Sequence, residues 1–215
     1  MVFTPVYRLE DRTIKAIMSL EWDGPLTFVL QRDNPHNDED VRQRGVKNHL
    51  HQYQRGRDTF LRGDYDALLV IEDDIIPPSD TLIRLAGIMN EHPECGIAFG
   101  TYLFRHSSNV LNILNRYKPW PQMTRNTGET LTIKTVELKK ARRRGVTDCS
   151  GSGLGCTLIR RDVVKAVPFE NYTDNGSHFD FPWNDEVYRR GYRMMADMNV
   201  KCGHIEDDGG VLWPS

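Results

Sequence analysis

Three consecutive carboxylates follow a short apolar strand in the first half of the chain. The strand is expected at Ala67 to Ile71, and the acids are Glu72-Asp73-Asp74. Pro77-Pro78 then keeps the strand from continuing. Open α/β sheets bind ligands at the carboxyl edge of their strands, where acids repel one another unless a cation, most economically a divalent metal, lies between them. The pattern therefore indicates a metal-dependent enzyme that acts on a phosphorylated substrate.

The order of side chains along the strand refines the metal hypothesis. Side chains alternate between the faces of an extended strand, so Glu72 and Asp74 are expected on one face and Asp73 on the other. Two carboxylates on one face can share a cation whose other sites go to phosphate oxygens and water. The alternative is that the acids only end the strand and face solvent.

A histidine late in the sequence is a second candidate metal ligand. His204 follows an extended stretch and Gly203, which allows close approach of the backbone. A neutral imidazole that completes a site with Asp74 suits Mn²⁺ or Mg²⁺, and the nitrogen ligand favours Mn²⁺. The alternative is a structural or surface histidine.

Two acids in an aromatic segment are candidates for a general base. Asp180 and Asp185 lie between His178 and Glu186, together with two phenylalanines and a tryptophan. Aromatic surroundings desolvate a carboxylate and raise its pKa, which suits proton abstraction. The alternative is that one of these acids caps the following helix.

The first hundred residues alternate between expected strands and helices. The strands are expected at Val2 to Val6, Pro25 to Leu30, Ala67 to Ile71 and Gly96 to Phe104. The helices are expected to start at Asp11, to span residues 40–62, and to run from Ser79 or Asp80 to Pro93. This alternation predicts an α/β fold with a mainly parallel, Rossmann-like central sheet flanked by helices.

The second half of the chain is less regular. Residues 107–135 have the pattern of a long loop, which in a compact domain is usually functional or disordered. The elements expected after it are a short basic helix at Leu138 to Arg144, a strand at Gly153 to Arg160, helices at Asp162 to Val167 and Glu186 to Arg190, and an extended stretch at Met194 to Ile205.

Size and composition fit one α/β domain. The chain has 215 residues and a net charge of −2, so it has no global attraction to nucleic acid or to an anionic membrane. No stretch is long and apolar enough to span a membrane, and the first residues do not form a signal peptide. We expect a cytoplasmic protein with four reduced, buried cysteines, Cys95, Cys149, Cys156 and Cys202.

Four segments occur in an order typical of one enzyme family. They are Thr4-Pro5-Val6-Tyr7-Arg8, Glu72-Asp73-Asp74, Gly153 to Arg161, and a closing block from Asp180 to His204. In this order they resemble the opening strand, the D-x-D motif, the strand after the acceptor-side segment and the closing block of GT-A glycosyltransferases, specifically the family-2-like group. Two positions depart from the family pattern, because Glu72 replaces the usual first aspartate and Phe179 replaces a glutamate.

The resemblance implies a single glycosyltransferase domain over residues 1–215. Residues 1–104 would form the nucleotide-sugar-binding half and residues 105–215 the acceptor-binding and catalytic half. The donor would be a nucleotide-diphosphate sugar, and the acceptor a hydroxyl group of a glycan, protein, lipid-linked molecule or nucleic acid. Asp180 would deprotonate that hydroxyl and give inversion at the anomeric carbon, with Asp185 as the competing candidate.

The same resemblance implies ligands for the metal and the nucleotide. Asp74 and His204, with Glu72 as a further ligand, would hold Mn²⁺ or Mg²⁺ on the diphosphate. The residues implied at the nucleotide sugar are Thr4, Pro5, Tyr7, Asp33, Arg57, Glu72 and Asp73.

Other functions stay open at this point. The basic run Lys139 to Arg144 is either a solvated helix end or a site for an anionic acceptor, which would fit a glycosyltransferase for modified bases in viral DNA. A nucleotidyltransferase is an alternative, although no glycine-rich basic loop follows the first strand. A non-catalytic sugar- or nucleic-acid-binding module is another, although the joint presence of Asp74, Asp180 and His204 is evidence against it.

Overall fold

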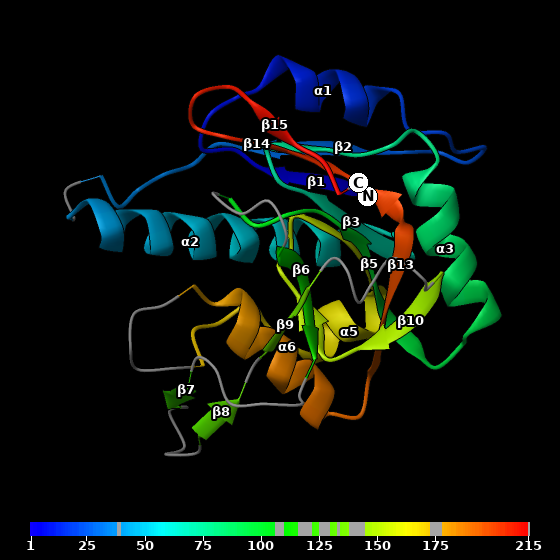
Figure 1. The fold of residues 1–215 in the computed structure, drawn as a ribbon. Coiled ribbons are helices and arrows are strands. Elements are labelled where there is room, and N and C mark those ends of the chain that lie inside the picture. Colours follow the sequence, from blue (N-terminus) through cyan, green and yellow to red (C-terminus); the bar gives the residue numbers. More distant parts are fainter. Residues whose placement is uncertain are drawn as a thin grey trace.

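The structure is a computed structural model that describes residues 1–37, 40–105, 110–115, 122–124, 130–132, 134–137, 145–172 and 178–214. Its centre is a seven-stranded sheet in the order β10-β13-β5-β12-β3-β1-β2 (Figure 1). These strands are β1 (Val2–Pro5), β2 (Phe28–Gln31), β3 (Ala67–Ile71), β5 (Cys95–Thr101), β10 (Val146–Cys149), β12 (Cys156–Arg160) and β13 (Arg193–Lys201).

Most strands of this sheet run in one direction. β2 and β3 pair in parallel with β1, and β13 pairs in parallel with β5. β12 lies between β3 and β5 and is antiparallel to both, and β10 is antiparallel to β13. The predicted α/β fold with a mainly parallel sheet is confirmed, and the two reversed strands are features that the sequence pattern did not reveal.

Helices cover both faces of the sheet (Figure 1). They are α1 (Asp11–Met18), α2 (Val41–Arg62), α3 (Thr81–Glu91), α5 (Arg161–Ala166) and α6 (Asp180–Arg189). Side chains alternate along β3, so Leu68 and Val70 pack in the cluster shared with α2, α5 and α6, while Leu69 and Ile71 pack in the cluster shared with α1 and α3. Burial on both faces explains why β3 is apolar throughout.

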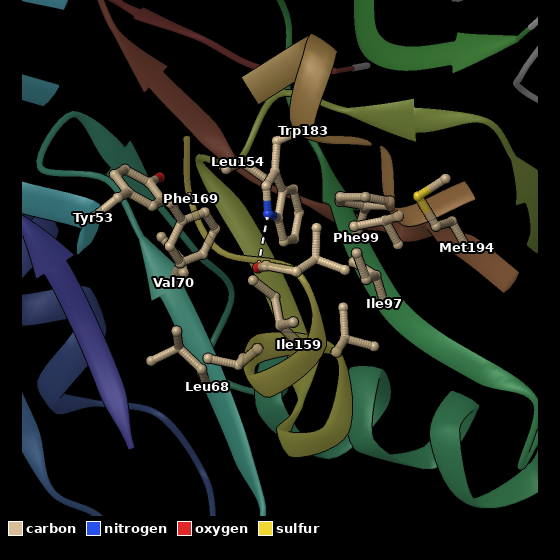
Figure 2. Packing of buried hydrophobic residues seen from close by; sticks show 14 of the residues in the cluster. Tyr53, Leu68, Val70, Ile97, Phe99, Leu154, Ile159, Phe169, Trp183 and Met194 are labelled. Carbon is tan, nitrogen blue, oxygen red and sulfur yellow. Dashed lines mark hydrogen bonds between the residues drawn. The ribbon is translucent and has the colours of Figure 1, made fainter. Parts of the chain in front are cut away.

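The buried indole of Trp183 explains where α6 begins. Its ring packs against Phe169 with the ring centroids 4.9 Å apart, and its Nε1 donates a hydrogen bond to the carbonyl of Val167 at 3.2 Å (Figure 2). Burial of this ring holds the preceding residues in a helical turn, where Pro182 is tolerated because the first turn needs no backbone donor. The predicted helix, which began well after Asp180, was therefore too short.

A small sheet at the carboxyl edge joins segments that are distant in sequence. It has the order β15-β14-β4 and consists of β4 (Ile75–Ile76), β14 (Gly203–Ile205) and β15 (Val211–Leu212). The amide of Ile205 donates to the carbonyl of Asp74 at 2.8 Å. The predicted extended stretch up to Ile205 is therefore two strands, β13 and β14, and the second of them lies beside the acid triplet.

The remaining strands belong to the second half of the chain. β6 (Val110–Asn115), β9 (Lys134–Glu137) and β11 (Gly151–Ser152) form a three-stranded sheet, and β7 (Gln122–Thr124) pairs with β8 (Thr130–Thr132). The long loop predicted at residues 107–135 therefore contains strands. The basic run Lys139 to Arg144 and its predicted helix lie outside the described residues.

All four cysteines are buried free thiols, as the sequence predicts. Burial raises the pKa of Cys95 to about 11 and that of Cys149 to about 12, so neither is a thiolate at neutral pH. Within the described ranges, no helix combines the length and apolarity that a membrane crossing requires.

Candidate active site

The acid triplet lies at the carboxyl edge of the central sheet. β3 ends at Ile71, and the amide of Glu72 donates to the carbonyl of Gly155 at 3.0 Å, just before β12. β12 runs antiparallel, so its glycine-rich entry reaches the edge at which β1, β3, β5 and β13 end. The triplet therefore occupies the position where open α/β sheets bind ligands.

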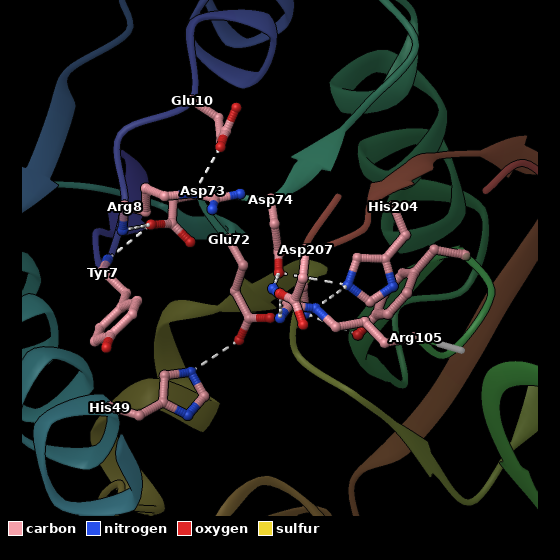
Figure 3. Close-up of polar contacts among 12 residues, drawn as sticks. Tyr7, Arg8, Glu10, His49, Glu72, Asp73, Asp74, Arg105, His204 and Asp207 are labelled. Carbon is pink, nitrogen blue, oxygen red and sulfur yellow. Dashed lines mark hydrogen bonds and ion pairs between the residues drawn. The ribbon is translucent and has the colours of Figure 1, made fainter. Parts of the chain in front are cut away.

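The three carboxylates point to three different places (Figure 3). The amide of Ile75 donates to the carbonyl of Glu72 at 3.0 Å, which makes residues 72–75 a tight turn rather than a continued strand. Strand alternation does not apply inside a turn. The prediction that Glu72 and Asp74 share one face was therefore wrong, and each acid has its own partners.

Glu72 points to helix α2. Its Oε1 accepts hydrogen bonds from Nε2 of His49 and from the hydroxyl of Tyr53, each at 2.9 Å. Burial acts to lower the pKa of His49, but the hydrogen bond and charge of Glu72 give a net rise. Burial and Glu72 together raise the pKa of Tyr53 well above its ordinary value. Glu72 thus joins the end of β3 to α2. Its predicted contact with a metal or a ribose stays a prediction.

The hydroxyl of Tyr53 provides a test of this link. We expect Tyr53→Phe to lower the free energy of unfolding by about 1–2 kcal/mol, because it removes one hydrogen bond to a charged and partly buried carboxylate but keeps the ring. Thermal unfolding followed by circular dichroism measures this loss. Tyr65→Phe is the matched control, since the Tyr65 ring stacks on Phe60 and its hydroxyl makes no hydrogen bond to a described residue. An equal loss in both variants would contradict the role of Glu72.

Asp73 holds the turn after β1. Its Oδ2 accepts hydrogen bonds from the amides of Tyr7 at 2.7 Å and Arg8 at 2.5 Å. Burial raises the pKa of Asp73 to about 6, against the lowering influence of these amides. Tyr7 is exposed at the edge, while Thr4 and Pro5 are buried in β1. Of the three predicted nucleotide contacts in this segment, Tyr7 is therefore the one whose side chain is open to a ligand.

Asp74 points to the segment around β14. Its Oδ2 lies 3.4 Å from Nε2 of His204 and pairs with the guanidinium of Arg105 (Figure 3). Arg105 also pairs with Asp207 at 3.1 Å. Burial acts to raise the pKa of Asp74, but His204 and Arg105 hold it below its ordinary value.

The side chains around Asp74 fit a divalent metal in their chemistry. Nδ1 of His204 lies 2.6 Å from the carbonyl of Leu103, and a proton on Nδ1 leaves Nε2 directed at Asp74 and Arg105. Metal-binding histidines commonly use such a carbonyl to orient the ring. Oδ1 of Asp74 is buried without a hydrogen-bond partner in the described part of the chain. No three His, Cys, Asp or Glu side chains among the described residues form a ready metal site, so diphosphate oxygens and water would have to supply the other ligands.

Asp180 and Asp185 lie at different places on α6. Asp180 is the first residue of the helix, and its Oδ1 is buried without a described hydrogen-bond partner. Burial raises the pKa of Asp180, with an added rise from Glu72 and an opposing effect of His178 and His49. Asp185 follows five residues later, about 140° around the helix, and pairs with Arg189 at 3.0 Å. Asp185 is therefore mid-helix and no helix cap.

Tyr102 lies among the candidate acids, although the sequence analysis did not single it out. Its hydroxyl accepts a hydrogen bond from the amide of Gly155 at 3.1 Å, and its ring centroid lies 5.4 Å from that of His204. A Cβ atom on Gly153 would clash with this hydroxyl and lie 3.9 Å from Oδ2 of Asp180. Burial, then the charge of Glu72 and smaller contributions from other acids, raise the pKa of Tyr102 well above its ordinary value.

Two predicted nucleotide contacts lie outside the acid cluster. Asp33 follows β2, and its Oδ2 lies 2.9 Å from Nε2 of His51, so it faces the middle of α2. The guanidinium of Arg57 donates to the carbonyls of Val164 at 2.8 Å and Lys165 at 3.1 Å. These bonds connect α2 to α5, so Arg57 has a structural partner and its contact with a diphosphate stays a prediction.

Three further residues belong to the cluster but were missed. His49 and Tyr53 are four residues apart on α2, and this spacing, which places them on one helix face, could have paired them. Nothing in the sequence around Arg105 distinguishes it, since only the tertiary structure brings it to Asp74.

Comparison with solved structures identifies the fold. The chain is similar to A197 from STIV, with a TM-score of 0.59 and 15% sequence identity, over 99% of this chain and 92% of that one. This likeness establishes the fold. The chain is also similar to CMP:2-keto-3-deoxy-manno-octonic acid synthetase complexed with CTP, with a TM-score of 0.46 and 13% identity, over 92% of this chain and 88% of that one. No protein-family model and no curated protein matches the chain.

Proposed function

We propose that this protein is a metal-dependent glycosyltransferase that moves a sugar from a nucleotide-diphosphate sugar to a hydroxyl acceptor with inversion. One observation carries the proposal. Two buried carboxylate oxygens, Oδ1 of Asp74 and Oδ1 of Asp180, have no hydrogen-bond partner among the described residues and belong to acids near the same tyrosine, Tyr102. An unpartnered buried acceptor is costly, so it needs an explanation, and a bound ion or ligand that supplies the missing partner is one.

The two acids would have different roles because their surroundings differ. Asp74 stays ionised beside His204 and Arg105, which suits binding of a cation. The raised pKa of Asp180 suits it to accept a proton near neutral pH. A glycosyl transfer needs both roles, because charge must be offset at the leaving diphosphate and a proton must be removed from the acceptor hydroxyl.

The transfer step follows from these roles. Asp180 takes the proton of the acceptor hydroxyl while the acceptor oxygen bonds to the anomeric carbon. The bond from that carbon to the diphosphate oxygen breaks at the same time, and attack from the opposite side inverts the centre. A Mn²⁺ or Mg²⁺ ion held by Asp74 and His204 would offset the charge of the departing nucleotide diphosphate.

The edge next to this centre would bind the nucleotide. Tyr7 is exposed after β1, and Asp33 with His51 lies after β2. An exposed aromatic ring can stack on a base, and a carboxylate can accept hydrogen bonds from a base or a ribose. The order of sites along the sheet would then be the nucleotide at β1 and β2, the diphosphate at β3, and the acceptor at α6.

A thermal-shift screen with and without Mn²⁺ tests the proposal. The ligands are nucleoside diphosphates, their sugar conjugates and nucleoside triphosphates. We expect one nucleoside diphosphate and its sugar conjugate to raise Tm only when Mn²⁺ is present. At 100 times Kd the stabilisation is about 2.7 kcal/mol, which is about 5–10 °C for a domain of this size.

The outcomes of the screen separate the alternatives. A nucleotidyltransferase would respond most to a triphosphate and release pyrophosphate when a sugar acid is added. A binding module would respond without releasing nucleoside diphosphate from any sugar conjugate. A response to no nucleotide in either condition would exclude the proposed function.

A further inference from the structure

Three side chains near the end of β3 and around β14 converge on one positive group. The guanidinium of Arg105 pairs through Nη2 with Oδ2 of Asp74 and through Nη1 with Oδ1 of Asp207 at 3.1 Å. Its Nε donates to Nε2 of His204 at 3.3 Å. Figure 3 shows these side chains gathered around the guanidinium. An internal cation therefore occupies the positions that oxygen and nitrogen ligands would offer to a metal.

We propose that Arg105 and a divalent cation compete for Asp74, His204 and Asp207, and that the exchange releases Arg105 to bind the diphosphate of the donor. The first half of this proposal needs no sugar donor, whereas the second half rests on the proposed function. Asp207, which the sequence analysis did not single out, would become a third ligand only after its carboxylate shifts towards Asp74 and His204, because the described side chains form no ready three-ligand site as they lie.

Charge balance favours such an exchange. Asp74, Asp207 and the Arg105 guanidinium together carry a net negative charge, whereas a divalent cation in place of the guanidinium would neutralise the two carboxylates. A guanidinium and a divalent cation on the same Oδ2 of Asp74 would repel each other, so the two cannot occupy these ligands together. A metal that takes Oδ2 of Asp74 together with Nε2 of His204 therefore requires Arg105 to move away.

The exposure of the side chains shows which of them can move. Asp74 and His204 are largely buried, with 15% and 9% of the side chain exposed. His204 is further fixed by its contact with the carbonyl of Leu103. Arg105 is 41% exposed and Asp207 is 69% exposed. Two ligands are thus held in place, while the more exposed Arg105 can turn into solvent.

The released guanidinium would remain at the carboxyl edge of the sheet, beside the acid triplet. Arg105 follows β5, whose carboxyl end lies at the same edge as that of β3. A guanidinium presents a planar fork of donors that matches phosphate oxygens. The diphosphate would therefore gain the cation that the metal displaces from Asp74, which couples the two binding events.

The variant Arg105→Gln separates the two halves of the proposal. The probes are Mn²⁺ alone, followed by electron paramagnetic resonance, and inorganic pyrophosphate at saturating Mg²⁺, followed by calorimetry. We expect Mn²⁺ affinity to rise about tenfold because the competing cation is gone, and pyrophosphate affinity to fall about tenfold because a charge-assisted donor is gone. General damage to the fold would weaken both, so opposite signs identify the exchange.

Two further variants complete the experiment. Arg193→Gln is the matched control, because Arg193 also bridges two acids, Glu94 and Asp148, but at the start of β13. It should change neither affinity. Arg105→Lys keeps the charge but loses the fork, so its Mn²⁺ affinity should rise by about threefold at most. It also provides the test if Arg105→Gln does not fold.

The outcomes distinguish this proposal from the proposed function. Unchanged or weaker Mn²⁺ binding by both Arg105 variants would overturn the competition. Unchanged pyrophosphate binding would overturn the release to the diphosphate. If both shifts occur but no nucleotide sugar is turned over by the wild-type protein, the exchange stands and glycosyl transfer is excluded.

Discussion

Replacement of Asp180 by asparagine should lower the rate of sugar transfer about a thousandfold and at the same time raise Tm by about 2–4 °C. The loss of rate follows from the loss of the proposed general base, since general-base catalysis typically contributes about 10²–10⁴-fold. The gain in stability follows from removal of a buried charge whose Oδ1 has no described partner. The expected gain is about 1 kcal/mol, because replacement of a residue kept for function rather than for stability commonly stabilises a protein by about this amount.

The pH dependence of this gain has a defined sign. The folded-state pKa of Asp180 is raised, chiefly by burial, so the folded protein binds this proton more tightly than the unfolded chain does. Stability is therefore lost as the pH rises from the unfolded pKa of about 4 through the folded pKa. The difference in Tm between Asp180→Asn and wild type should reach its full size at pH values above the folded-state pKa. It should disappear as the pH falls towards 4.

Asp185→Asn is the matched control for this variant. Asp185 lies on the same helix but pairs with Arg189, so the variant should keep transfer activity and should not gain stability. Steady-state kinetics and thermal unfolding of both variants provide the comparison. If Asp185→Asn abolishes transfer while Asp180→Asn keeps it, the general base is Asp185 and not Asp180.

Asp74→Asn should reduce Mn²⁺-dependent binding of the nucleotide sugar by at least about a hundredfold. The side chain keeps its size but loses the charge that both His204 and Arg105 contact. Loss of a residue that only orients a metal ligand already costs about 10–100-fold in affinity, so loss of a charged ligand should cost more. Calorimetry with and without Mn²⁺ measures the effect, and binding without Mn²⁺ should change little.

Asp66→Asn controls for a general effect of charge. Asp66 precedes the same strand, β3, but lies at its opposite end. This variant should bind the nucleotide sugar and Mn²⁺ like the wild type. Unchanged Mn²⁺-dependent binding in Asp74→Asn would exclude Asp74 as a metal ligand. Its ion pair with Arg105 would then be a purely structural feature.

The alternating half of the fold was predictable because local signals agree with the tertiary structure. Apolar runs bounded by proline or glycine located β1, β3 and β5, and apolar spacing located α1 and α3 within a few residues. The start of α6 was missed because burial of Trp183 against Phe169, a tertiary contact, decides it. The direction of β12 was missed because a short apolar strand carries no information about which way it runs.

The candidate site was predictable only in part, for a related reason. Residue type and position after a strand located Glu72, Asp73 and Asp74 at the sheet edge. Their individual partners depend on the tight turn at residues 72–75, which strand periodicity does not describe. Arg105 reaches Asp74 through tertiary structure alone, so no pattern of spacing could have revealed it.

The pairing of β4 with β14 has a consequence for how the protein folds. It closes a loop of about 130 residues, and contacts of such high sequence separation carry a large entropic cost and form slowly. β1, β2 and β3 can pair earlier through shorter connections, whereas in the described sheet β5 joins them only through β12. A refolding chain should therefore pass through a state in which β1, β2 and β3 have paired but the edge with β4 and β14 has not formed, and the capacity to bind Mn²⁺ should return more slowly than the circular dichroism signal.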